Sequence, residues 1–229
     1  MTAPVQPPAE QRRQVGRRRA VFGDHVAEEV DRLQAGYLAT PARPTAVATL
    51  ARLRAVIEST VNSSYAILPV TEVPEEFLRQ DTAIAGRAQP PDATDEPLPS
   101  ERAKHAALTL YAVHQQSLRD RRMHRDGVGL GTAVALLVTA SPNPEAVRRR
   151  FAALGTATTT VETVRHLRGL VRLLRDTRIT LDYGLLADDL RMLHRPDGPD
   201  RVRAWWGREH YRALNAARAK NKNTEEETA

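Results

Sequence analysis

The sequence contains no cysteine, so it forms no disulfide, zinc–thiolate site or cysteine nucleophile. This composition fits a reducing compartment. No apolar run approaches the roughly 20 residues that a bilayer-spanning helix needs, and the longest covers only residues 133–138. The N-terminus is polar and rich in arginine, unlike a secretory signal peptide. We therefore expect a cytoplasmic protein with no membrane partner.

Aromatic residues are also scarce, with two Trp, five Tyr and three Phe. None is interleaved with the arginines, which argues against a surface on which nucleic-acid bases stack. No segment alternates apolar and polar residues with the spacing of a β-strand. A chain of 229 residues can bury a substantial core. We predict an all-α protein with roughly eight or nine helices in two small helical bundles.

The distribution of proline, glycine and charge predicts how the chain is divided. Residues 1–20 are expected to form a disordered basic tail. An N-terminal bundle follows over residues 21–126 and contains an irregular, proline-rich loop at 80–100. A C-terminal bundle covers residues 127–221, and the boundary lies at the glycine-rich hinge 125–131. Residues 222–229 are expected to form a disordered acidic tail.

Apolar spacing and capping residues predict the individual helices. Asn143, Thr159 and Asp182 are suited to cap three of them. His114, Gln115 and Gln116 lie inside an apolar helix, so we expect them to be buried and hydrogen-bonded to neighbouring backbone. We expect His114 to be a structural histidine rather than a ligand. The expected helices lie near 24–38, 45–57, 74–79, 100–122, 131–139, 144–155, 160–176, 183–193 and 200–220.

The segment 161–175, VETVRHLRGLVRLLR, carries two stripes at helical spacing. The apolar stripe is predicted to face the core, and it contains Val164, Leu167, Val171 and Leu174. The second stripe consists of arginines within an arc of about 80° on the neighbouring face. Its members are Arg165, Arg168, Arg172 and Arg175.

The net charge of +6 is unevenly distributed, because residues 21–100 are acidic and residues 101–221 are strongly basic. A basic half indicates a polyanionic partner, although charged stripes are also common on solvated helix faces. Arginine suits phosphate because its guanidinium group can engage two oxygens. The predicted nucleic-acid contacts are Arg52, Arg54, Arg125, Arg148, Arg149, Arg165, Arg168, Arg172 and Arg175.

Motifs for catalysis are missing from the sequence, which has no HExxH and no GxSxG. The glycines of GVGLG, residues 127–131, match neither the dinucleotide-binding nor the Walker pattern. Asp182 and Asp189 are seven residues apart, which leaves a metal-dependent nuclease as one alternative. A metal site needs more convergent ligands than these two, and capping explains Asp182. We therefore expect no catalytic residue, no metal and no cofactor.

Several spaced motifs together resemble the CasB family, whose members are the small subunit of the type I-E CRISPR surveillance complex, Cascade. The resemblance covers residues 100–212 and extends weakly to TLARLRAV at 49–56. The motifs are LTLYAVHQQS (108–117), MHRDGVGLG (123–131), RRRFAAL (148–154), HLRGLVRLLR (166–175), LDYGLLADDL (181–190) and RVRAWWGREHYR (201–212).

The resemblance implies a non-enzymatic helical protein of antiviral defence. Its implied partners are the other Cascade subunits, a second copy of itself in a homodimer within the complex, the guide RNA, and the target and displaced DNA strands. The implied role is to hold the R-loop through RNA and DNA binding. A helical adaptor that binds only proteins, through its acidic and basic halves, is the alternative.

Overall fold

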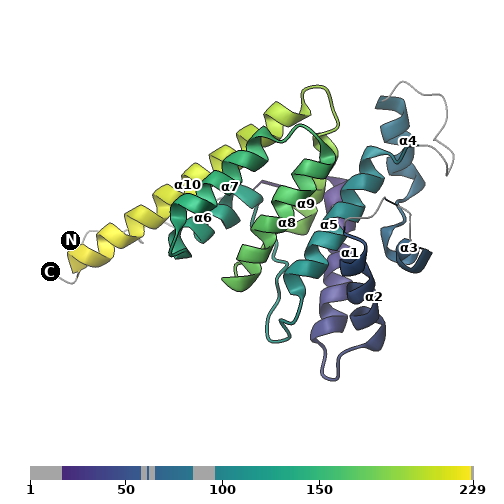
Figure 1. The fold of residues 1–229 in the computed structure, drawn as a ribbon, viewed down its shortest axis with the longest axis horizontal. Helices are drawn as coiled ribbons and strands as arrows, with labels where there is room; N and C mark the ends of the chain where they lie inside the picture. Colours follow the sequence, from purple (N-terminus) through teal and green to yellow (C-terminus); the bar gives the residue numbers. More distant parts are fainter. Residues whose placement is uncertain (1–16, 58–60, 62–64, 85–95, 228–229) are drawn as a thin grey trace, which may run out of the picture.

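A computed structural model describes residues 17–57, 61, 65–84 and 96–227, with side chains described as far as residue 219. These residues form ten α-helices and one short 3₁₀ helix, and they contain no β-strand (Figure 1). The elements are α1 (Val21–Leu38), α2 (Pro44–Ala55), η1 (Tyr65–Ile67), α3 (Leu68–Thr71), α4 (Glu75–Ile84), α5 (Pro99–Gln115), α6 (Leu130–Ala140), α7 (Pro144–Thr156), α8 (Thr160–Asp176), α9 (Tyr183–Met192) and α10 (Gly198–Glu227).

The all-α prediction is confirmed, and the helix beyond the expected eight or nine is α3. This helix is a single turn of four residues, which is too short to show periodicity in the sequence. The other large difference is the end of α5, which we expected near residue 122. Helix α5 ends at Gln115 because the Gln115 amide donates to the carbonyls of Leu118 and Arg121, at 2.6 and 3.0 Å. Ser117 then adopts a φ of 64°, which no α-helix accommodates.

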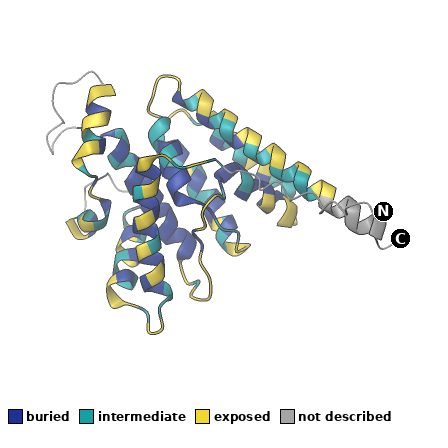
Figure 2. Cartoon of the chain, turned by 180° about the vertical axis from the view of Figure 1, so that it is seen from behind, coloured by how far each residue is buried: buried dark blue, intermediate teal, exposed yellow. Residues whose placement is uncertain are grey.

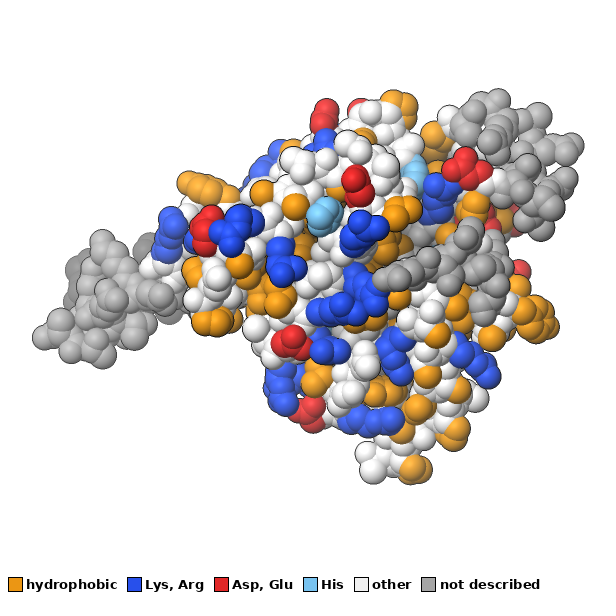
Figure 3. All heavy atoms as spheres, viewed as in Figure 1, with side chains coloured by type: hydrophobic (Ala, Val, Ile, Leu, Met, Phe, Trp, Pro, Cys, Tyr) orange, Lys and Arg blue, Asp and Glu red, His pale blue; other side chains and the backbone are white. Residues whose placement is uncertain are grey.

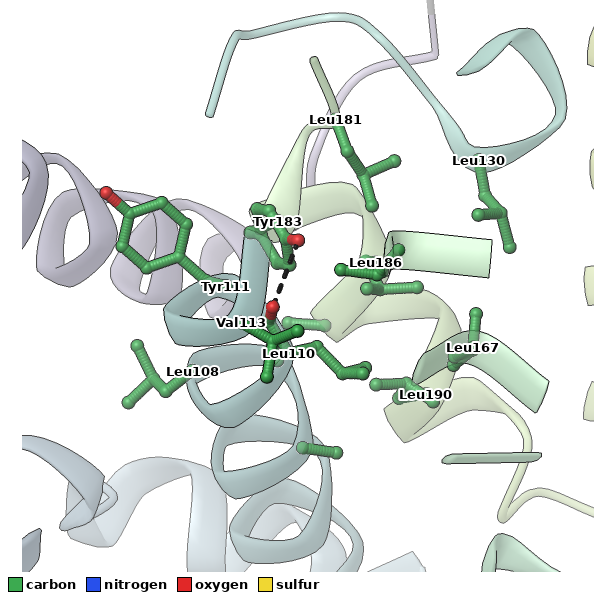
Figure 4. Close-up of a cluster of buried hydrophobic side chains, with 14 of the residues drawn as sticks. Leu108, Leu110, Tyr111, Val113, Leu130, Leu167, Leu181, Tyr183, Leu186 and Leu190 are labelled. Atoms are coloured by element: carbon green, nitrogen blue, oxygen red, sulfur yellow. Dashed lines mark hydrogen bonds between the residues drawn. The ribbon is translucent and has the colours of Figure 1, made fainter. Parts of the chain in front are cut away.

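Helix α5 lies at the centre of the core and contacts α1, α2, α4, α8 and α9. Nearly all of its residues are buried, so it is enclosed on every side (Figure 2). Small residues such as Ala107 and Ala112 allow neighbouring helices to approach closely. Figure 4 shows leucines of α8 and α9 on one side of α5, with Tyr183 near Leu110, while the ring of Tyr111 points to the other side. Burial of these apolar side chains is the main source of the fold's stability.

Two of the three polar residues predicted to be buried near the end of α5, His114 and Gln115, are buried and hydrogen-bonded, whereas Gln116 is exposed. A hydrogen bond of 2.9 Å joins the Tyr183 hydroxyl and His114 Nδ1. Burial lowers the pKa of His114 to about 3, so the imidazole is neutral at physiological pH. Gln115 fixes the backbone that follows α5, since its Oε1 also accepts from the Met123 N–H at 3.1 Å. Both residues therefore have structural roles.

The buried residues on the two sides of residue 126 belong to one hydrophobic cluster, because α1 and α5 pack against α8 and α9. The division into two bundles stays a prediction. Helix α10 lies along α6 and extends to Glu227, beyond the expected end near residue 220. It is the long helix that projects to one side in Figure 1. The loop predicted at 80–100 is helical to Ile84, and residues 85–95 lie outside the described residues.

The glycines of GVGLG allow α6 to pack closely on α10. A Cβ atom on Gly131 would lie 2.1 Å from the Trp206 carbonyl oxygen, so no side chain fits there. The Gly131 N–H instead donates to the carboxylate of Glu209 on α10, at 3.1 Å. This turn therefore binds a carboxylate of the chain itself at the N-terminal end of α6, where a helix favours negative charge.

Replacing Gly131 with alanine should lower the free energy of unfolding by at least about 2 kcal/mol, because α6 and α10 must move apart. Gly207 on α10 is the matched control, since a Cβ atom there meets nothing within 4 Å. Gly207→Ala should be neutral or stabilise the protein by up to about 1 kcal/mol, through helix propensity. Urea denaturation of the two variants measures both effects, and similar values would contradict the close packing.

Candidate nucleic-acid interface

Helix α8 has the predicted amphipathic structure. Its N-cap Thr159 accepts a hydrogen bond from the Glu162 N–H at 3.2 Å, and Glu162 accepts in turn from the Thr158 N–H. Leu167, Val171 and Leu174 are fully buried, whereas Val164 is half-buried. These contacts fix the rotation of α8 about its axis. The arginine stripe is thereby placed beside the core rather than in it.

The arginines of α8 differ in how far the protein neutralises them. Arg165 and Arg172 are exposed, and no described residue forms a salt bridge or hydrogen bond with either. Arg168 is half-buried, and its pKa is lowered by burial and by the nearby positive charge of Arg172. Arg175 pairs with the adjacent Asp176 at 3.0 Å. Positive charge is therefore least compensated at Arg165 and Arg172.

Helix α7 packs against α8 and adds arginines to this region. A Cβ atom on Gly169 of α8 would lie 3.6 Å from Arg150 Nη1, so Arg150 reaches across to the arginine stripe. Arg148 forms an ion pair with Glu145 at 3.2 Å, and Arg149 is exposed. The sequence did not single out Arg150, because three consecutive arginines fan widely around a helix. Only the packing of α7 against α8 shows that Arg150 is the arginine that reaches the stripe.

Arg52 and Arg54 lie in the last turn of α2, which packs against α5 as α8 does. Arg52 is exposed, and Arg54 is half-buried with Nη1 enclosed and without a hydrogen-bond partner among the described residues. A hollow of about 640 Å³ joins this end of α2 to α8, since Ile57, Arg165 and Arg168 all line it. Figure 3 shows basic side chains gathered across this middle part of the molecule.

Arg125 lies elsewhere. It lines a separate hollow of about 420 Å³ whose other walls include Asp31 and Asp126. None of the residues that line this hollow also lines the one beside α8. The two carboxylates weaken the positive potential around Arg125. The structure therefore does not bring Arg125 together with the arginines of α8.

The end of the predicted disordered tail is ordered, because Arg17 and Arg19 bind carboxylates far along the chain. Arg17 Nη1 lies 2.7 Å from Oδ1 of Asp189, whose side chain is fully buried and also accepts from Trp206 Nε1. Arg19 contacts Asp182, and it also pairs with two exposed carboxylates. Residues 17–20 contact the helices, although we expected the tail to extend to residue 20, and residues 1–16 lie outside the described residues.

The two carboxylates of the nuclease alternative are held by the protein. Asp182 caps α9 as predicted, accepting from the Leu185 N–H at 3.0 Å, and it also accepts from the Gly127 N–H at 2.7 Å. Asp189 is occupied by Arg17 and Trp206. These contacts give both residues structural roles, and neither presents an open carboxylate for a metal-dependent reaction.

The carboxyl group of Asp188 should make the stability of the fold depend on pH. Burial raises its pKa to about 6, although the Ala20 N–H donates to it at 2.7 Å. The folded state therefore favours the protonated form. Its stabilising contribution is complete below the ordinary Asp pKa of about 4 and is lost as pH rises through about 6. Asp188→Asn should flatten the curve of unfolding free energy against pH in that range, and an unchanged curve would contradict this assignment.

The fold and the charges define a small helical protein with arginines gathered around one amphipathic helix. The model of the family described as CRISPR-associated protein Cse2 matches residues 49–211. The chain belongs to this family, also called CasB, the small subunit of the type I-E Cascade complex. The sequence-based assignment is therefore confirmed.

Solved structures agree with the family. CasB from Thermobifida fusca is 38% identical, with a TM-score of 0.66, and the match covers 84% of this chain and 99% of that chain. CasB from Thermus thermophilus is 23% identical, with a TM-score of 0.57, and shares the fold over 82% of this chain and 97% of that one. No curated protein matches the sequence closely enough to count as a relative. Among the described residues, no helix is long and apolar enough to cross a membrane.

Proposed function

We propose that the protein acts in Cascade without catalysis, by binding nucleic-acid backbone through the arginines around α8. The observation that carries this proposal is the exposed pair Arg165 and Arg172, which no described residue neutralises, with Arg150 reaching across from α7. Guanidinium groups engage phosphate oxygens in pairs, so such a surface suits a polyanion of any sequence.

The proposed role is to stabilise the R-loop formed by the guide RNA and the target DNA. Exchange of the DNA duplex for the RNA–DNA hybrid is nearly balanced, so contacts to backbone from a protein can tip it. Guide pairing reads the sequence, and a cationic surface that ignores sequence is sufficient for this subunit. The protein partners that we propose are other Cascade subunits and a second copy of this chain.

The proposed contacts combine the predicted arginines with one that the structure adds. Arg125 and Arg175 stay predictions, because Arg125 lies in a separate hollow and Arg175 is paired with Asp176. Arg148 also stays a prediction, because it is paired with Glu145. The contacts that the geometry favours are Arg52, Arg54, Arg149, Arg150, Arg165, Arg168 and Arg172.

An electrophoretic mobility shift with the full chain separates this proposal from the protein-binding adaptor. At about 50–100 mM salt, contacts to phosphate dominate binding. The proposal predicts a shift with single- and double-stranded DNA of unrelated sequences, and the shift should weaken steeply as salt rises. The adaptor predicts no shift at any salt concentration.

A further inference from the structure

The hollow between α2, α5 and α8 has walls of two chemical kinds. One kind is apolar, and each of the three segments contributes to it: Ile57 follows α2, Pro97 precedes α5, and Val164 lies on α8. The other kind is charged and consists of Arg102, Arg165 and Arg168, with the carboxylate of Glu96 beside Arg102. The volume of about 640 Å³ lies within the range of small-molecule sites, roughly 300–1,000 Å³.

The cations of the hollow are not equivalent. Arg102 is already engaged, because it pairs with Glu96 and its Nε donates to the Pro97 carbonyl at 2.8 Å. Arg165 is exposed and has no such partner among the described residues. An anion that enters the hollow would therefore be bound from the α8 side, where the arginine stripe begins.

His105 also lines the hollow and is only 5% exposed. Neither of its ring nitrogens makes a hydrogen bond of good geometry with a described residue, although the Val56 carbonyl lies close enough to interact with the ring. Burial lowers the pKa of His105, although a nearby Val56 carbonyl works against this, so the ring is neutral. A neutral imidazole offers one donor and one acceptor, and a nucleobase edge presents groups of both kinds. Buried polar groups usually have a partner, and the Val56 carbonyl can serve only one ring nitrogen, so the other nitrogen indicates a ligand with a polar edge.

We propose that this hollow binds one unstacked nucleotide of a single strand, with its base between the apolar walls and its phosphate at Arg165 and Arg168. The inference rests on the proposed function, because α8 must first bind the backbone. The scarcity of aromatic residues argued against a platform on which bases stack. Enclosure between aliphatic side chains is a different way to hold a base, and it needs no aromatic ring.

The test compares two strands in their binding to the full-length wild-type protein. Both have about 15 nucleotides, and in one of them every base is replaced by an abasic spacer. We expect the strand with bases to bind roughly 10-fold more tightly, since enclosing a base contributes on this scale. The slopes of log K against log salt should be equal, because the two strands carry the same phosphates.

A variant that fills the hollow locates the effect. Val164→Trp should remove the roughly 10-fold preference for bases and leave the salt slope unchanged. Leu136→Trp is the matched control, because Leu136 is an exposed apolar residue on α6 that does not line the hollow. This control should keep the preference.

Three outcomes separate the two proposals. Equal wild-type affinity for the two strands, with a steep salt slope, would overturn the nucleotide site and leave backbone binding intact. No binding of either strand at low salt would overturn both proposals. If Val164→Trp weakened the binding of both strands equally, the hollow would bind something other than a base, such as an apolar side chain of a protein partner. The wild-type comparison stands even where a variant fails to fold.

Discussion

Replacing Arg17 with alanine should lower the free energy of unfolding by about 3–5 kcal/mol. The variant leaves the carboxylate of Asp189 fully buried and without the cation that pairs with it. Burial already raises the pKa of Asp189 even with Arg17 in contact. Removing Arg17 therefore makes the ionised form of this carboxylate still less favourable in the folded protein. The melting temperature should fall by roughly 10 °C in a domain of this size.

Arg18 provides the matched control, because it is the neighbouring arginine and its side chain is exposed. Arg18→Ala should change the free energy of unfolding by no more than about 0.5 kcal/mol. Adding Asp189→Asn to Arg17→Ala should recover part of the loss, since a neutral amide leaves no unpaired charge. A melting temperature for Arg17→Ala equal to that of Arg18→Ala would show that residues 17–20 do not bind the folded protein.

Replacing both Arg165 and Arg172 with alanine should weaken binding to single-stranded DNA about 10-fold or more at 50–100 mM salt, which corresponds to about 1.4 kcal/mol. Both side chains are exposed, and no described residue forms a salt bridge or hydrogen bond with either. The melting temperature and the helical content by circular dichroism should therefore stay close to those of the wild-type protein. Fluorescence anisotropy with a labelled strand measures the affinity.

The control for this pair removes the same charge from another helix. Arg208 and Arg212 are exposed on α10, and Arg208→Ala with Arg212→Ala also lowers the net charge by two. If α8 forms the interface, the control should weaken binding much less than the α8 pair. Equal weakening by the two pairs would mean that DNA responds only to the overall charge of the protein.

Local signals in the sequence were sufficient to predict α8 and the cap of α9. The two stripes of α8 follow from spacing alone, and Thr159 and Asp182 cap their helices through contacts that span only three residues. Such short-range geometry is encoded within one or two turns. The same holds for Gln115, whose burial in an apolar helix required partners.

The features that the sequence did not predict depend on contacts between distant segments. Arg17 lies in a stretch with no apolar periodicity, and nothing local indicates that Asp189 is its partner. Arg150 could not be told from its two neighbours until the packing of α7 on α8 was known. The hollow beside α8 is built from three segments that are separated in the chain.

The most direct test of the interface is the dependence of affinity on salt for the wild-type protein and the Arg165→Ala, Arg172→Ala variant. Each phosphate contact to a single strand contributes about 0.7 to the slope of log K against log salt. The variant should therefore have a slope smaller by about 1.4 if both arginines contact phosphate. An unchanged slope, with unchanged affinity at low salt, would contradict backbone binding by α8.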